Sequence, residues 1–191
     1  MDINKTIRKQ NKAYKRFVLT MAFIFLILPL LVVFLHILSI YIIMYLLIIE
    51  LLIIVVIFIK MNNECLKFTF NKYKLSIKNG LLHNKINIMC DKIVLVHIIE
   101  ENNNWGIIIL TKSKFRNKDI KAVDAGFLKN YSYVAYHYSR IKKLHPEEQY
   151  FYIILRSGSL GKYELLNTIF KNSGNAYFTD EAIEKIKEYR K

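Results

Sequence analysis

An apolar stretch from Phe17 to Ile59, with almost no interruption, constrains this chain more than any other feature. Apart from tyrosines, His36 and Glu50 are its only titratable side chains. A soluble domain does not bury a segment of this length and composition, whereas about 20 consecutive apolar residues cross a bilayer as one helix. The sequence therefore predicts a membrane protein.

The stretch is too long for a single span. As one helix it would measure roughly 64 Å, about twice the thickness of the hydrocarbon core. We predict a transmembrane hairpin over residues 17–59, with helices at 17–34 and 40–59 and a tight turn near Leu35–Ser39. A cleaved signal peptide does not explain the first half, because its apolar region is too long and a second span follows without a small-residue cleavage site.

The basic residues around the hairpin predict its orientation. Residues 1–16 contain six Lys or Arg side chains, Lys60 and Lys67 follow the second span, and the connecting turn has none. The positive-inside rule then places both termini in the cytoplasm. Residues 1–16 would form a basic tail, either an amphipathic helix on the membrane surface or a frayed segment. Residues 62–191 would form one cytoplasmic domain.

The net charge of +14 predicts attraction to anionic partners. A basic domain tethered to the inner leaflet faces anionic lipid headgroups, and each Lys or Arg near that surface contributes about 1 kcal/mol. Nucleic acid is the other partner that basic charge suggests, but the charge is scattered and forms no recognisable reading module. We therefore expect anionic lipids, a protein partner or a second copy of the chain, and no nucleic acid.

The domain begins with a predicted antiparallel meander. Apolar and polar residues alternate over several short runs, and Asn79-Gly80 between two such runs is a strong hairpin signal. From Phe68 to Thr111 this pattern indicates four or five strands. The expected strands are Lys67–Phe70, Tyr73–Ile77, Leu81–Met89, Lys92–Ile99 and Trp105–Thr111.

The rest of the domain is predicted to be mixed. A short helix is expected at Ala122–Leu128, and Asn130–Leu144 fits a strand or a helix, with the spacing of its apolar residues favouring the helix. Gln149–Leu155 reads as a strand. Two C-terminal helices follow, one at Leu160–Lys171 and one that Thr179 would cap. The fold class is therefore a transmembrane hairpin followed by an α+β domain with an antiparallel sheet and C-terminal helices.

This arrangement resembles the membrane-anchored bacterial PH-like domain proteins. The resemblance depends on the hairpin, on Tyr73-Lys-Leu-Ser-Ile-Lys-Asn-Gly-Leu-Leu82, on Ile-x-x-Val at Ile93–Val96 and on the helical end. The matching motif covers about residues 67–110, and the chain departs from the family in having two C-terminal helices. The resemblance implies a bacterial cytoplasmic membrane, a PH-like fold, and binding or assembly at the membrane without catalysis. For some members it implies protection against membrane-active peptides.

One segment has the arrangement of an anion site. Residues 156–162 join a strand to a helix, where backbone N–H groups and the helix dipole attract phosphate. The segment is not a P-loop, because its glycine spacing is too short and Tyr163 replaces the residue that binds magnesium. Two interpretations stay open: a turn capped by Ser157 or Ser159, or a lipid-headgroup site. The candidate binding residues are Arg156, Ser157, Gly158, Ser159, Gly161 and Lys162.

Glu50 is the second candidate, because it lies near the middle of the second span. An acid at that depth is a functional-site hypothesis by default. One interpretation is a protonated side chain that hydrogen-bonds to Thr20 or to a neighbouring subunit, a contact worth roughly 1 kcal/mol. The other is a functional carboxyl that joins the chain to a larger membrane complex.

No set of residues predicts catalysis. The histidines lack metal-ligand spacing, and no paired Cys and His residues suggest zinc. Five carboxylates are expected at turns, where solvated charges belong: Asp91, Glu100, Glu101, Glu147 and Glu148. We therefore predict no catalytic residue, no metal and no cofactor. The expected function is a non-enzymatic membrane protein whose domain binds a protein partner or anionic lipid. The alternative is an accessory or regulatory subunit of a transporter or export machinery, assembled through the second span and Glu50.

Overall fold

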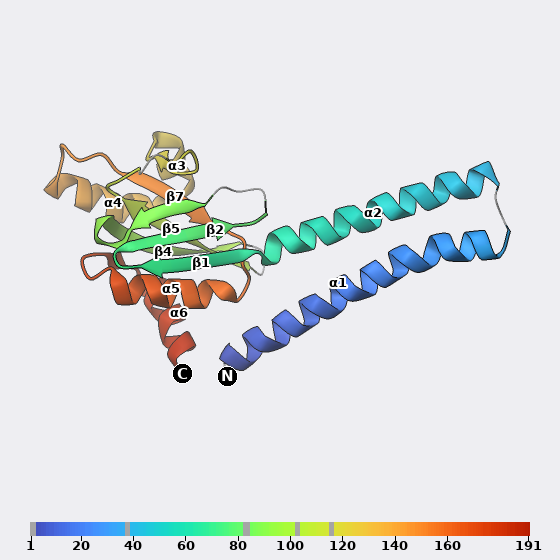
Figure 1. Cartoon of the computed structure of the whole chain (residues 1–191). Helices are drawn as coiled ribbons and strands as arrows, with labels where there is room; N and C mark the ends of the chain where they lie inside the picture. The colour runs from blue at the N-terminus through green and yellow to red at the C-terminus, as the bar shows by residue number, and fades with distance from the viewer. Residues whose placement is uncertain (1–2, 37–38, 82–84, 102–103, 115–116) are drawn as a thin grey trace.

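The two apolar segments fold as long helices. A computed structural model describes residues 3–36, 39–81, 85–101, 104–114 and 117–191. Two helices, α1 (Ile3–Phe34) and α2 (Ile40–Glu64), extend side by side from a domain of sheets and shorter helices (Figure 1). Each contains a stretch long and apolar enough to cross a membrane. The two helices of the predicted hairpin are therefore present, and two residues of its turn, Ile37 and Leu38, lie outside the described residues.

The helices of the hairpin face each other along stripes of half-buried side chains. In α2 the half-buried positions recur every three or four residues, which is the spacing of one helix face. They include Ile42, Leu46, Glu50, Ile53 and Ile57. At the base of the hairpin, the Gln10 side-chain amide donates a hydrogen bond to the Glu64 carboxylate.

The basic N-terminal segment continues the first helix. Residues 3–16 belong to α1, so the boundary predicted at residue 16 is not a structural one, and these residues are not frayed. A helix lying on a membrane surface would have to turn away from the hairpin axis. Instead α1 follows the hairpin axis over its whole length, and its N-terminal end lies beside α6 (Asp180–Arg190), near the C-terminus (Figure 1).

The domain contains two sheets. In the first, β1, β2 and β3 form an antiparallel meander. In the second, the strand order is β6-β7-β5-β4-β8, and only the β4–β8 pair is parallel. The strands are β1 (Leu66–Asn71), β2 (Lys74–Asn79), β3 (Ile86–Met89), β4 (Ile93–Glu101), β5 (Asn104–Thr111), β6 (Lys121–Ala122), β7 (Phe151–Leu155) and β8 (Tyr177–Phe178).

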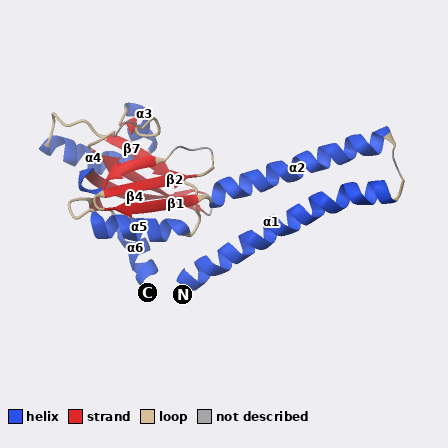
Figure 2. Cartoon of the chain, in the orientation of Figure 1, coloured by secondary structure: helices blue, strands red, loops and turns tan. Residues whose placement is uncertain are grey.

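Helices cover both faces of the second sheet. The larger core lies between the two sheets and against α5 (Gly161–Asn172) and α6. A smaller core on the opposite face packs against α3 (Ala125–Asn130) and α4 (Ser132–Leu144) (Figure 2). Most core residues are Ile, Leu and Val, and each fully buried one contributes about 1.5–3 kcal/mol.

The predicted elements are mostly confirmed, and four of them need correction. Thr179 precedes α6 but its side chain makes no capping hydrogen bond, and the helix predicted at Ala122–Leu128 begins only at Ala125. The segment Asn130–Leu144 is helical from Ser132, so the strand alternative is wrong. The strand predicted at Leu81–Met89 begins only at Ile86. Contacts with the end of α2 explain why Leu81 is not part of this strand. The Leu81 N–H donates to the Asn62 side chain, and the Gly80 N–H donates to the Cys65 carbonyl. These bonds hold residues 80–81 against the end of α2.

The strands give the domain two opposite ends. Since β1 follows α2 directly, its first residue and the last residue of β2 lie at what we call the hairpin end. The β1–β2 turn and the 3₁₀ turn Cys90–Lys92 lie at the far end. At roughly 3.3 Å per strand residue, β1 separates the two ends by about 20 Å.

Candidate functional site

The predicted anion segment is a docking turn for the hairpin. Gly158 has a φ of +105°, and a Cβ atom there would lie 2.3 Å from the Cβ of Leu66. Its N–H donates to the Asn63 carbonyl at 2.8 Å. The turn therefore packs against the junction between α2 and β1, and glycine is needed both for its backbone conformation and for the close approach.

Several backbone N–H groups of this turn already have acceptors. The Leu160 N–H donates to the Gln10 side-chain oxygen at 3.4 Å, and the Gly161 N–H to the Gly158 carbonyl at 2.8 Å. No side chain caps α5, so Ser157 and Ser159 do not act as predicted for a capped turn. The structure thus assembles neither the capped turn nor the phosphate cradle.

Lys162 points into the domain and not toward solvent. It is fully buried, at 0% exposure. Its ammonium group donates to the Asn104 side-chain oxygen at 2.8 Å, to the Arg156 carbonyl at 3.1 Å and to the Trp105 carbonyl. All three donors of the ammonium group are thereby used. Burial away from water lowers the pKa of Lys162 from 10.5 to about 8.

The Arg156 side chain lies at the surface, although its carbonyl accepts from the Lys162 ammonium. Its guanidinium donates to the Tyr131 hydroxyl at 3.0 Å. It also lines a polar hollow of about 320 Å³ at the edge where the two sheets meet. Lys118 and Lys121 line the same hollow, together with Asp119. Arg156 therefore contributes positive charge at the hairpin end without the predicted lysine.

Three other lysines gather at the hairpin end, and we call them the lysine cluster: Lys67, Lys78 and Lys85. They come from β1, β2 and the residue before β3, and all three are exposed. Lys67 and Lys78 are directly opposite partners in the β1–β2 ladder. Together they line a hollow of about 190 Å³ whose other residues are Phe68, Thr69 and Ser76. No carboxylate lines this hollow.

The lysine cluster was missed because it depends on strand register. Alternation places Lys67 and Lys78 on the outer face of their strands, which the sequence shows. Their pairing follows only when the turn is placed at Lys72-Tyr73, between β1 and β2. Like charges directly opposite each other destabilise a sheet by some tenths of a kcal/mol, so the pairing is a signal for an anionic partner.

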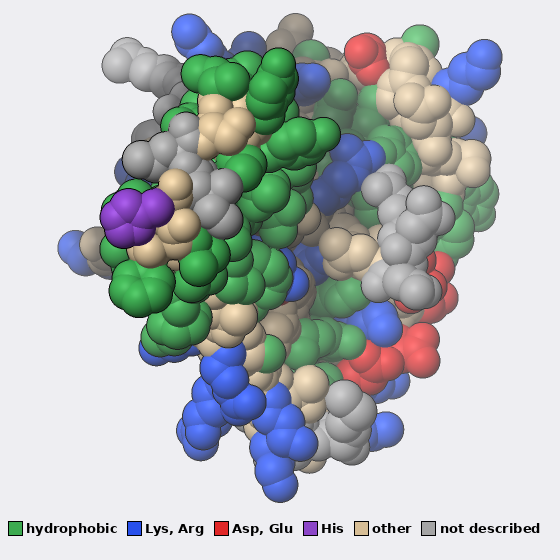
Figure 3. Space-filling model, turned by 90° about the vertical axis from the view of Figure 1, so that its right-hand side faces the viewer, with side chains coloured by type: hydrophobic (Ala, Val, Ile, Leu, Met, Phe, Trp, Pro, Cys, Tyr) green, Lys and Arg blue, Asp and Glu red, His purple; other side chains and the backbone are tan. Residues whose placement is uncertain are grey.

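The hairpin end is positively charged around the helices. Viewed along the hairpin from its tip, hydrophobic side chains cover the helices, and Lys and Arg side chains lie on several sides of them (Figure 3). Asp and Glu side chains gather mainly on the right of this view. Lys60 is paired with Glu64 at 3.2 Å. The lysine cluster adds unneutralised positive charge close to this pair.

The histidines of the described residues form no metal centre. No group of His, Cys, Asp or Glu that could hold a metal ion occurs in the described part of the chain, and His83 lies outside it. His97 is buried and lies 3.1 Å from the Thr179 hydroxyl and 3.7 Å from the Glu181 carboxylate. Burial lowers the pKa of His97 more than Glu181 raises it.

Glu50 lies on the stripe of α2 that faces α1. It is half-buried, and no hydrogen bond or ion pair joins it to any other residue that the structure describes. Thr20, its predicted partner, is exposed. A carboxyl group without a partner is costly in a hydrocarbon environment.

Comparison of the chain with protein families, with curated proteins and with solved structures gives no match.

Proposed function

We propose that this protein is a non-enzymatic, membrane-anchored binding module. Its hairpin spans a bacterial cytoplasmic membrane with both termini in the cytoplasm. Its α+β domain, of PH-like type, binds anionic lipid headgroups through the lysine cluster. Two sheets followed by terminal helices agree with the PH-like type. The family resemblance extends the proposal to protection against membrane-active peptides.

The position of the lysine cluster is the observation that carries this proposal. The apolar part of α2 ends at Ile59 and β1 begins at Leu66. The intervening residues place the cluster about 10 Å beyond the hydrocarbon core, since a helix rises roughly 1.5 Å per residue. This is the depth of the headgroups and about one Debye length at physiological salt. The contribution of each lysine is then about 1 kcal/mol.

The docked α1 helix supports the same proposal. Gln10 contacts both Glu64 of the hairpin and the Leu160 N–H of the domain. Because Gln10 joins α1 both to α2 and to the domain, the domain does not swing freely on the end of α2. The lysine cluster is therefore kept toward the bilayer without an additional ordering penalty on binding.

The test is retention of lipid by the full-length protein. The purified chain in nonionic detergent would be offered equal amounts of phosphatidylglycerol and phosphatidylcholine, and native mass spectrometry would count the bound lipids. We expect selective retention of phosphatidylglycerol that weakens with salt. Changing Lys67, Lys78 and Lys85 together to Ser should reduce it about tenfold, since three contributions near 1 kcal/mol are partly additive.

The matched control changes three other exposed lysines to Ser: Lys129, Lys143 and Lys171. This control removes the same amount of positive charge, so it distinguishes an effect of the lysine cluster from an effect of the total net charge. Equal losses in the two triple variants, or no preference between the lipids, would refute the proposal.

Glu50 supports a second candidate function, an accessory subunit of a larger membrane complex. A third helix that packs over the seam between α1 and α2 would reach the Glu50 carboxyl, which has no partner in the described chain. Glu50→Gln keeps the hydrogen-bonding capacity, whereas Glu50→Leu removes it. We expect co-purifying membrane subunits to survive the first change and to be lost in the second. The same subunits in both variants, or none in either, would exclude this candidate.

A further inference from the structure

The polar hollow beside Arg156 lies at the hairpin end of the domain, and we call it the edge pocket. It has a volume of about 320 Å³, which is small for a ligand pocket and suits a headgroup better than a whole lipid. The ends of β2 and β7 and the residues before β6 form it. Its polar lining residues are Asn79, Lys118, Asp119, Lys121, Tyr152 and Arg156.

Two oxygen atoms of the edge-pocket lining lack a hydrogen-bond donor. Asn79 Oδ1 and Asp119 Oδ2 are buried, and neither has a partner among the residues that the structure describes. Asn79 as a whole is only 8% exposed. Buried polar groups are nearly always hydrogen-bonded, and leaving one without a partner is costly. A ligand with hydroxyl groups would supply the missing donors.

The edge pocket lies at the same level as the lysine cluster. Asn79 is directly opposite Leu66, the first residue of β1, and the next pair of the ladder is Lys78 with Lys67. Successive side chains of a strand point to opposite faces. Lys78 therefore belongs to the lysine cluster and Asn79 to the edge pocket, and the two sites flank the end of β2.

Asn117 joins the edge pocket to the lysine cluster. Its side-chain amide donates to the Lys85 carbonyl at 3.1 Å, and its side-chain oxygen accepts from the Asp119 N–H at 3.0 Å. Asn117 is itself buried. Asp119 is therefore held in place beside the residue that supplies one lysine of the cluster, and a headgroup drawn to the cluster has the edge pocket within reach.

The charges of the edge pocket suit an anion that also carries hydroxyl groups. Three cationic side chains and one carboxylate, Asp119, line it, so its net charge is positive. Arg156 already donates to the Tyr131 hydroxyl, which leaves Lys118 and Lys121, both exposed, as the groups that would bind a phosphate. Asp119 opposes a plain anion but accepts hydrogen bonds from hydroxyl groups.

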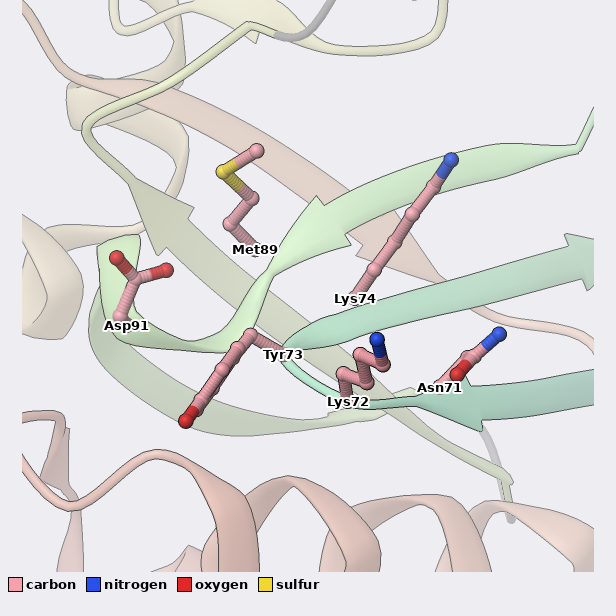
Figure 4. A pocket seen from close by; sticks show the side chains of 6 residues that line it. All are labelled: Asn71, Lys72, Tyr73, Lys74, Met89 and Asp91. Carbon is pink, nitrogen blue, oxygen red and sulfur yellow. The ribbon is translucent and has the colours of Figure 1, made fainter.

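A larger hollow at the far end of the domain lacks these features. It has a volume of about 680 Å³ and lies at the β1–β2 turn, where Lys72 and Lys74 point to one side and Tyr73 to the other (Figure 4). The turn contains two residues, and such turns commonly require a positive φ, which explains the +55° of Lys72. The side chains of this hollow therefore do not converge on a ligand.

We propose that the edge pocket binds a glycerol phosphate group. Its phosphate pairs with Lys118 and Lys121, and its hydroxyl groups donate to Asn79 and Asp119. The inference rests on the proposed lipid function and deepens it. The lysine cluster attracts anionic lipids by charge, and the edge pocket selects those whose headgroup carries hydroxyl groups, as phosphatidylglycerol does. Free glycerol phosphate has the same chemistry.

The test compares phosphatidylglycerol with phosphatidylmethanol, whose headgroup has the same charge and no hydroxyl group. The full-length protein in nonionic detergent would be offered equal amounts of both lipids and of phosphatidylcholine, and native mass spectrometry would count the bound molecules. We expect both anionic lipids to be retained over phosphatidylcholine. Phosphatidylglycerol should be retained about tenfold more than phosphatidylmethanol, the scale of one hydrogen bond to a charged group.

Two single substitutions assign this preference to the edge pocket. Asn79→Ala and Asp119→Ala should each reduce it to about twofold, because each removes an acceptor of the headgroup hydroxyls. Retention of phosphatidylmethanol should not fall in either variant. The thermal midpoint of Asn79→Ala should not fall either, since the oxygen that it removes has no partner. Asp119, which is only half-buried, provides the same test independently.

A double substitution tests the phosphate contacts. Lys118→Ser with Lys121→Ser should lower phosphatidylglycerol retention several-fold. The matched control, Lys129→Ser with Lys171→Ser, removes the same charge from two other exposed positions and should retain the lipid as the unchanged protein does. Equal losses in these two double variants would contradict the assignment of the phosphate to the edge pocket.

Free glycerol phosphate identifies the source of the ligand. If the pocket serves a soluble molecule, an excess of glycerol phosphate should abolish the preference for phosphatidylglycerol, whereas methyl phosphate should not. If the pocket serves the lipid, the preference should persist. Both results agree with glycerol phosphate as the recognised group, and they assign it to a metabolite or to the membrane.

The outcomes separate this inference from the proposed lipid function. Equal retention of the two anionic lipids, or a preference that survives both single substitutions, would overturn the inference and leave the lipid function intact. The triple lysine-cluster variant should lower both lipids together and keep their ratio. Retention of neither lipid over phosphatidylcholine would refute the lipid function. Absence of bound glycerol phosphate in the same measurement would then overturn the inference as well.

Discussion

The ammonium group of Lys162 lies 5.0 Å from the centre of the Trp105 ring and donates a hydrogen bond to the Trp105 carbonyl. Trp105 is the second residue of β5 and Lys162 is the second residue of α5, so this contact holds the start of the helix against the sheet. Among the side chains that the structure describes, carbonyl oxygens and the indole ring stabilise this buried cation.

We predict that Trp105 fluorescence titrates near pH 8. Burial lowers the pKa of Lys162 to about 8, and Trp105 is the only tryptophan of the chain. Loss of the ammonium charge beside the ring should change the emission over a narrow pH range. A titration of the full-length protein from pH 6.5 to 9.5 measures this. The change should be absent in Lys162→Met, and a transition that persists in that variant would contradict the prediction.

The same contact predicts how stability depends on pH. The unfolded chain holds the Lys162 proton up to its ordinary pKa of 10.5, whereas the folded protein releases it near pH 8. The free energy of unfolding therefore rises with pH between about 8 and 10.5. Relative to Lys162→Met, the unchanged protein should gain up to about 3 kcal/mol across this window. Chemical unfolding of both proteins at pH 7.5 and pH 10 measures this gain. Titration of the tyrosines affects both proteins equally and therefore cancels in the comparison.

Lys162 also shows what the sequence contained and how it was missed. Leu165, Leu166 and Ile169 follow it at three, four and seven residues, the positions of one helix face. This spacing places Lys162 on the buried face of α5, so its burial was predictable. The glycines before it suggested phosphate binding, but their role depends on Leu66 and Asn63, which are far away in the sequence.

Local patterns predicted the fold better than they predicted the site. The hairpin follows from the length of its apolar run, and β4 and β5 follow from dense Ile and Val residues. The extent of β3 could not be predicted, because contacts with Asn62 and Cys65 at the end of α2 decide it. The lysine cluster depends in the same way on the register between two strands.

Gly158→Ala is predicted to loosen the hairpin from the domain. The new Cβ would lie 2.3 Å from the Cβ of Leu66, at a φ of +105°. Both the clash and the backbone strain oppose it, and we expect a loss of about 2 kcal/mol or more in the free energy of unfolding. Gly174→Ala is the control, because nothing lies within 4 Å of its added Cβ. Thermal melting of the two variants in detergent should differ clearly, and equal midpoints would contradict the docking role of the turn.

His97 predicts a loss of stability in acid. Burial holds its pKa below the usual value of 6.5, although Glu181 opposes the shift. The unfolded chain therefore binds a proton below pH 6.5 that the folded protein refuses, and the free energy of unfolding falls as the pH falls through this window. Thermal midpoints between pH 7.5 and pH 5 measure the effect. His97→Gln should lower this acid dependence. If His97→Gln shows the same acid dependence as the unchanged protein, the dependence arises from other titratable groups.

Gln10→Ala is predicted to release the first turn of α5. The Gln10 side chain donates to Glu64 and accepts from the Leu160 N–H, so it joins both helices of the hairpin to the domain. Without it, the Leu160 N–H loses its acceptor and the α1 contact is weakened by about 1 kcal/mol. Hydrogen exchange of residues 158–163 should then be several-fold faster. Asn11→Ala, an exposed neighbour on α1, is the control and should leave exchange unchanged. Equal exchange in the two variants would mean that Gly158 and Leu66 alone dock the hairpin.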